Sequence, residues 1–189
     1  MKNLTWFARP DKFKNRLIMV ILGVLIQGFG LSWIIEVSFG TDPCSAFTQG
    51  VISHVPLSFG TAQLLINIIL FVVVFLADTS LIGFGTIANM VFIGYISDFC
   101  RFIYSKTLPA ELFQNTTTRI IILIPALIVF ILGAAMYMTA GLGTSPYDAI
   151  AFIVSERAEN IPFKFIRMSW DIIFLLLGWI MGGNIGVVT

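Results

Sequence analysis

Long apolar stretches alternate with short polar segments along the whole chain. Five of the stretches come close to the length of about 20 residues that a helix needs to cross the hydrocarbon core of a bilayer. We therefore predict membrane-spanning helices at 17–37, 61–77, 81–104, 120–140 and 163–181. The expected fold class is all-α, and the chain is expected to be a polytopic helical membrane protein.

A short polar phrase follows the first apolar stretch and recurs after the fourth. Its two copies are Ser38-Phe39-Gly40-Thr41-Asp42-Pro43-Cys44 and Gly141-Leu142-Gly143-Thr144-Ser145-Pro146-Tyr147-Asp148. Asp42 and Ser145 are favourable N-cap residues, and the proline after each suits the first position of a helix. Ser145 and Asp148 also have the spacing of a capping box. Each phrase therefore predicts a short helix, at 43–54 and at 146–158, too short to span a bilayer.

The recurrence extends beyond the phrase, which indicates an internal duplication. At an offset of 103 residues the chain pairs Gly30 with Gly133, Gly40 with Gly143, Thr41 with Thr144, Ala46 with Ala149, Ile82-Gly83 with Ile185-Gly186, and Thr86 with Thr189. A gap of one residue after the phrases also pairs Asn67 with Asp171. We predict repeat 1 at 17–105, a polar linker at 106–118 and repeat 2 at 119–189.

Three spans in the first repeat would place the second repeat upside down in the membrane. The predicted architecture is therefore an inverted repeat. The residue that matches the start of the third span is Thr189, so repeat 2 lacks its last span in this chain. We expect the native product to continue for about one further span past Thr189, or a partner to supply that helix.

Basic residues concentrate in the segment 1–16, ahead of the first span. We predict that this segment is cytoplasmic or interfacial, because basic residues near the first span favour the cytoplasmic side. The N-terminus is then inside, and the segment 39–60 faces outside.

The composition supports a membrane protein and argues against several other classes. The chain is 58% hydrophobic and 11% charged, whereas a soluble domain carries about 25% charged residues. Its mean hydropathy is +0.96. The net charge of +1 gives no overall field that would attract nucleic acid. A single histidine and the lack of catalytic or metal-binding motifs predict no metal, no cofactor and no enzymatic activity.

The candidate site follows from the two predicted helix starts. A helix N-terminus carries about half a positive charge and free N–H donors, and transporters with inverted repeats use such ends to bind substrates near the midplane. On this interpretation the predicted substrate-binding residues are Gly40, Thr41, Asp42, Asn67, Gly143, Thr144, Ser145, Asp148 and Asp171. A second interpretation remains open, in which each phrase is only a capped turn at the membrane surface. Asp171 then pairs with Arg167, and Asn67 makes an interhelical hydrogen bond.

The phrase Gly-Leu-Gly-Thr-Ser-Pro-Tyr-Asp, its weaker first copy and Gly83-Phe84-Gly85-Thr86 resemble the YczE/YitT-type bacterial membrane proteins. The resemblance covers nearly the whole chain. It implies a six-span protein of the bacterial plasma (inner) membrane, multi-pass, whose molecular function is unestablished. The chain departs from that pattern by lacking the last span and by having Asp42-Pro43-Cys44 where the second copy has Ser145-Pro146-Tyr147.

We expect an integral membrane transporter or facilitator for a small polar solute, with an anionic solute as one option. Two alternatives remain: a substrate-binding membrane subunit of a larger transporter, and an assembly or regulatory membrane protein that handles no solute. The expected partners are the lipid bilayer and a small-molecule solute, with a homo-oligomer or a membrane partner left open. No nucleic-acid partner is expected.

Overall fold

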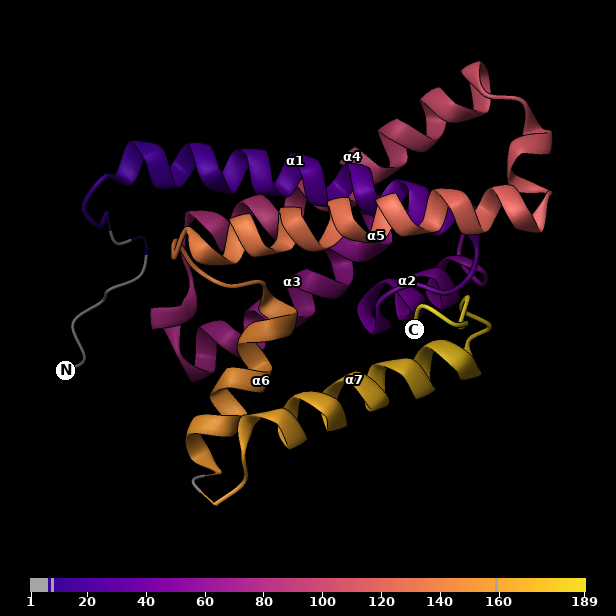
Figure 1. Cartoon of the computed structure of the whole chain (residues 1–189). Helices are drawn as coiled ribbons and strands as arrows, with labels where there is room; N and C mark the ends of the chain where they lie inside the picture. Colours follow the sequence, from indigo (N-terminus) through magenta and orange to yellow (C-terminus); the bar gives the residue numbers. More distant parts are fainter. Residues whose placement is uncertain (1–6, 8, 159) are drawn as a thin grey trace.

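The computed structural model describes residues 7, 9–158 and 160–189, and in this part of the chain the regular structure is entirely helical (Figure 1). Two 3-10 turns, η1 and η2, accompany seven α-helices. The elements are α1 Phe13–Val37, α2 Pro43–Ile52, α3 Phe59–Ala77, η1 Thr79–Leu81, α4 Phe84–Thr107, η2 Ala110–Phe113, α5 Thr116–Thr139, α6 Pro146–Arg157 and α7 Phe163–Ile180. The predicted all-α fold class is confirmed.

Four of these helices are long and apolar enough to cross a membrane, among the residues described: α1, α3, α4 and α5. The fifth predicted span is also a helix, α7, but it does not belong to this group. Its 18 residues include three charged side chains, Lys164, Arg167 and Asp171. The last two of these side chains pair with each other and with residues of α6.

The third predicted span begins later than its apolar pattern indicates. We placed its start at 81, whereas α4 begins at Phe84. The reason is local: Asp78 accepts a hydrogen bond from the backbone N–H of Ser80 and starts the turn η1, and Gly83 then caps α4.

Two long helices, α1 and α5, run side by side in opposite directions (Figure 1). Glycines allow their backbones to approach closely. A Cβ atom on Gly133 would lie 2.4 Å from the backbone nitrogen of Gln27, and one on Gly30 would lie 2.6 Å from that of Phe130. Since α1 and α5 end at opposite ends of the pair, the chain enters the short helices α2 and α6 from opposite ends.

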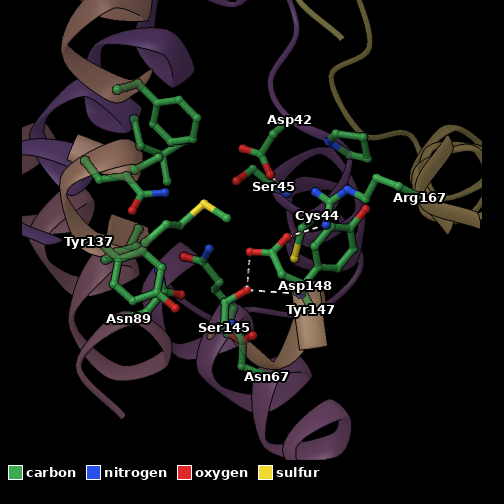
Figure 2. Close-up of a pocket in the computed structure, with 18 residues that line it drawn as sticks. Asp42, Cys44, Ser45, Asn67, Asn89, Tyr137, Ser145, Tyr147, Asp148 and Arg167 are labelled. Carbon is green, nitrogen blue, oxygen red and sulfur yellow. Dashed lines mark hydrogen bonds and ion pairs between the residues drawn. The ribbon is translucent and has the colours of Figure 1, made fainter. Parts of the chain in front are cut away.

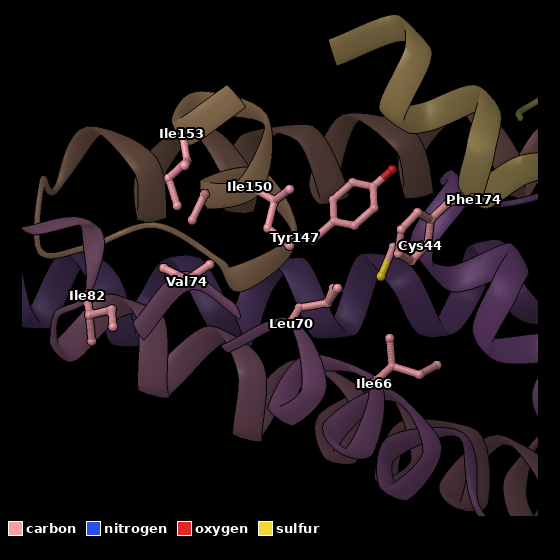
Figure 3. Packing of buried hydrophobic residues seen from close by; sticks show 10 residues of the cluster. Cys44, Ile66, Leu70, Val74, Ile82, Tyr147, Ile150, Ile153 and Phe174 are labelled. Carbon is pink, nitrogen blue, oxygen red and sulfur yellow. The ribbon is translucent and has the colours of Figure 1, made fainter. Parts of the chain in front are cut away.

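The remaining helices surround this pair in a crossed arrangement. Helix α4 packs against α1 and α3, whereas the short helix α2 packs against α7 and the short helix α6 packs against α3. Each short helix thus contacts a long helix from the other half of the chain. Figure 3 shows the apolar cluster that joins them, which includes Cys44, Ile66, Leu70, Val74, Ile82, Tyr147, Ile150, Ile153 and Phe174.

Candidate functional site

Both repeated phrases form a sharp turn into a short helix, as predicted. Gly40 and Gly143 have φ angles of +96° and +103°, in a region that side chains rarely adopt. The carboxylate of Asp42 then accepts a hydrogen bond from the Ser45 N–H at 3.0 Å, and the Ser145 hydroxyl accepts one from the Asp148 N–H at 3.1 Å. We call these two turns the first junction (Phe39–Asp42) and the second junction (Leu142–Ser145).

The second junction lies against the Gly-x-x-Thr sequence at the start of α4. The Gly85 N–H donates to the Leu142 carbonyl at 2.7 Å. A Cβ atom on Gly143 would lie 2.5 Å from Thr86 Oγ1 and 2.6 Å from the backbone nitrogen of Gly83. The Thr86 hydroxyl in turn accepts a hydrogen bond from the Gly83 N–H at 3.0 Å. The second junction therefore rests on backbone that belongs to the first half of the chain.

The first junction makes the same contacts with the Gly-x-x-Thr sequence at 186–189. The Val188 N–H donates to the Phe39 carbonyl at 3.1 Å, and the Gly186 N–H donates to Thr189 Oγ1 at 3.1 Å. A Cβ atom on Gly40 would lie 2.3 Å from that Thr189 oxygen and 2.6 Å from the Gly186 nitrogen. Every residue in these contacts lies 103 positions from the residue that makes the matching contact at the other junction.

A polar cavity of about 220 Å³ lies where the two short helices begin (Figure 2). Asp42 and Ser45 at the start of α2 line it, as do Ser145 and Asp148 at the start of α6. The remaining polar and sulfur-bearing residues of its wall are Gln27, Cys44, Gln63, Asn67, Asn89, Tyr137, Met138, Tyr147 and Arg167. Helix starts from both halves of the chain therefore meet at one cavity.

One guanidinium group holds two carboxylates beside this cavity. Arg167 forms ion pairs with Asp148 and, at 3.2 Å, with Asp171. Asp171 also accepts a hydrogen bond from the Tyr147 hydroxyl at 2.6 Å, and Asp148 accepts one from the Ser145 hydroxyl at 2.7 Å. This network fastens α7 to the start of α6. It also explains why charged residues are tolerated in α7, since a charge without a partner is costly in a membrane.

Several polar groups of the cavity wall have no such partner in the described part of the chain. Asp42 forms no ion pair there, although its carboxylate caps α2. Gln27 Oε1 and Gln63 Oε1 are buried, without accessible surface and without a hydrogen-bond partner. Leaving such a group unsatisfied costs about 1–3 kcal/mol.

The structure brings four of the predicted site residues to the cavity wall: Asp42, Asn67, Ser145 and Asp148. The other five lie outside the wall: Gly40, Thr41, Gly143, Thr144 and Asp171. The glycines and threonines form the junctions behind it, and Thr41 is fully buried. Asp171 is connected to the cavity wall through its ion pair with Arg167.

The site predicted from the sequence did not include five further residues of the wall: Gln27, Gln63, Asn89, Tyr137 and Arg167. The first three were detectable as isolated polar residues inside apolar spans. In the described residues, no group of three or more His, Cys, Asp or Glu side chains is placed to hold a metal ion. The polar residues of the wall can therefore bind a ligand through hydrogen bonds and charge interactions.

The apolar helices and the polar cavity between them define a multi-pass helical membrane protein. The chain belongs to a family of unknown function, DUF6198, whose family model matches residues 14–189. Together with the Bacillus subtilis relatives YczE and YyaS, this match confirms the resemblance noted in the sequence.

Among known proteins, the chain is similar to the uncharacterized membrane protein YczE of Bacillus subtilis, with 30% identity over 88% of this chain and 75% of the relative. An uncharacterized protein of Haemophilus influenzae is 25% identical over 90% of this chain and 75% of its own length. The uncharacterized protein YyaS of Bacillus subtilis is 26% identical over 89% and 82%, respectively. No solved structure matches the chain.

Proposed function

We propose that this protein is a transporter or facilitator that passes a small polar solute through the cavity between its two halves. The observation that carries the proposal is the meeting of two helix starts, one from each half, at a polar cavity inside an otherwise apolar protein. Ligand sites in transporters are commonly built from such short or broken helices. In this proposal the protein lies in the bacterial plasma membrane with its N-terminus in the cytoplasm, and it is not an enzyme.

The proposed mechanism uses an inverted repeat. The matched contacts of the two junctions support this architecture, because the same hydrogen bond recurs as Gly85 to Leu142 and as Val188 to Phe39. Two equivalent halves that hold each other by equivalent contacts can exchange roles. Rocking of one half against the other would then open the cavity first to one side of the membrane and next to the other.

Asn67 offers a test of transport that leaves the junctions intact. It is 4% exposed, lines the cavity and, among the described residues, donates only to the Gln63 carbonyl of its own helix. We expect Asn67→Leu to lower solute flux about tenfold, because it replaces a polar wall group by an apolar one of similar size. The measurement is osmotic swelling of proteoliposomes in isosmotic urea, glycine, methylammonium chloride and sodium acetate, with ionophores that carry the chloride and sodium counter-ions and with Gln114→Leu in the exposed loop as the control.

Proteoliposomes that swell no faster than empty liposomes in any of these solutions would contradict autonomous transport. Co-purification with an ATPase-bearing partner would then favour a substrate-binding subunit instead. Equal flux through Asn67→Leu and Gln114→Leu would show that solutes do not pass this cavity.

A further inference from the structure

We infer that the cavity takes small cations with N–H donors, of the class of protonated amines, and excludes anions. This assignment rests on the proposed function and names its substrate class. It differs from the expectation drawn from helix N-termini alone, which included an anionic solute.

The balance of charge around the cavity favours a cation. Three carboxylates lie at or directly behind its wall, those of Asp42, Asp148 and Asp171, whereas Arg167 is the one basic side chain among the described lining residues and their ion-pair partners. Two helix N-termini contribute roughly half a positive charge each. Burial raises the pKa of Asp42, so an excess of about one negative charge is present when the pH lies above that pKa and all three carboxylates are ionised.

Much of the positive charge at the cavity is already engaged. Arg167 is shared between Asp148 and Asp171, and one N–H group at the start of each short helix is capped, that of Ser45 by Asp42 and that of Asp148 by Ser145. An arriving anion would meet the Asp42 carboxylate, which has no ion pair in the described chain, and would have to compete with Asp148 and Asp171 for Arg167. An arriving cation would meet an uncompensated acceptor.

The acceptors of the wall also favour a cation with N–H bonds. Asn67 lines the cavity and donates through Nδ2 to the Gln63 carbonyl, which leaves its Oδ1, an atom that only accepts hydrogen bonds. The Asp42 carboxylate is a second acceptor of the wall. A ligand that satisfies these oxygens must donate, as an ammonium group does with its N–H bonds.

The volume of the cavity limits the size of the ligand. A space of about 220 Å³ corresponds to roughly seven water molecules in the liquid. The apolar part of the wall, from Leu31, Ile93 and Phe130, provides a surface for a short alkyl group. Small alkylammonium ions fit this combination of size, charge and partial apolarity.

Cys44 is a native reporter for the charge preference because its side chain lines the cavity. In a Cys100→Ala background it is the only thiol. Membranes containing this variant would be treated with ethylammonium methanethiosulfonate or with its anionic sulfonatoethyl analogue, two reagents of similar size. Each rate is divided by the rate of the same reagent with a small free thiol, which removes differences in intrinsic reactivity.

We expect the cationic reagent to be favoured by roughly tenfold or more, as one uncompensated charge at close range requires. Asp42→Asn should reduce the preference several-fold while keeping the helix cap, since Asn is an equally good N-cap residue. Methylammonium chloride should slow the cationic reaction. Glu111→Gln, an exposed carboxylate in the loop before α5, is the matched control and should leave the ratio unchanged.

A ratio near one, a preference for the anion, or no effect of Asp42→Asn would overturn the assignment. Failure of both reagents to reach Cys44, with normal labelling after denaturation, would overturn it as well. These outcomes are distinct from failure of the proposed function. Swelling in urea or acetate but not in methylammonium chloride would support the transport proposal and contradict the preference for cations. Selective labelling without swelling would support the cation site and contradict the transport proposal.

Discussion

Replacing Gly143 by alanine is expected to disrupt the second junction, and replacing Gly40 is expected to do the same to the first. Each new Cβ would meet backbone nitrogen at 2.6 Å, which a side-chain rotation cannot relieve, and each position has a positive φ. Strain and overpacking together should lower the free energy of unfolding by about 2–5 kcal/mol. The measurement is the yield of monodisperse protein and its thermal unfolding in detergent.

Gly141→Ala is the matched control for both variants. It lies in the same loop with a φ of +62°, but its nearest neighbour would be the flexible end of the Arg16 side chain, at 3.1 Å. We expect this variant to lose much less stability. If all three alanine variants unfold alike, the positive φ alone explains the effect, and the interlocking of the junctions with the Gly-x-x-Thr sequences contributes little.

The second large effect is expected from Arg167→Gln. Without the guanidinium group, Asp148 and Asp171 lose their shared partner and the start of α6 is no longer tied to α7. Breaking a fully buried pair costs about 3–5 kcal/mol, and a side chain that is 31% exposed should lose less, about 1–3 kcal/mol. Thermal unfolding monitored by tryptophan fluorescence measures the loss.

Removing the two carboxylates that have lost their partner should restore much of the lost stability. The triple variant Arg167→Gln, Asp148→Asn, Asp171→Asn keeps the shape of the network and eliminates the uncompensated carboxylates. The control is Arg157→Gln, an exposed arginine that forms no ion pair in the described chain. A triple variant no more stable than Arg167→Gln would contradict the electrostatic explanation.

Local signals in the sequence were sufficient to predict the short helices. Asp42 and Ser145 cap them, and Pro43 and Pro146 occupy the first turn, as the chemistry of helix starts requires. These signals act within three or four residues. The predicted ends at 54 and 158 were one or two residues late, because fraying and caps at C-termini leave weaker signals.

Contacts between the halves could not be predicted in the same way. The repeat showed that Gly83 corresponds to Gly186, but it gave no sign that each lies under the junction of the other half. The spacing of Arg167 and Asp171 on one helix suggested their pairing, whereas the pairing of Arg167 with Asp148 depends on how α7 folds back on α6. Cavity residues such as Gln27 and Gln63 stood out in the sequence as polar residues within apolar spans. The sequence did not show toward which neighbour their side chains point.

The proposed function depends on one feature of the fold, the meeting of the starts of α2 and α6 at one cavity. Cross-linking of Cys44 to a cysteine at position 145, in the Cys100→Ala, Ser145→Cys variant, tests it most directly. With a short bifunctional thiol reagent in native membranes, we expect an efficient intramolecular cross-link, because both positions line the same cavity. Ser155→Cys, farther along α6 and outside the cavity wall, should cross-link poorly. Equal or lower efficiency at 145 than at 155 would contradict the claim and leave the two junctions as separate capped turns.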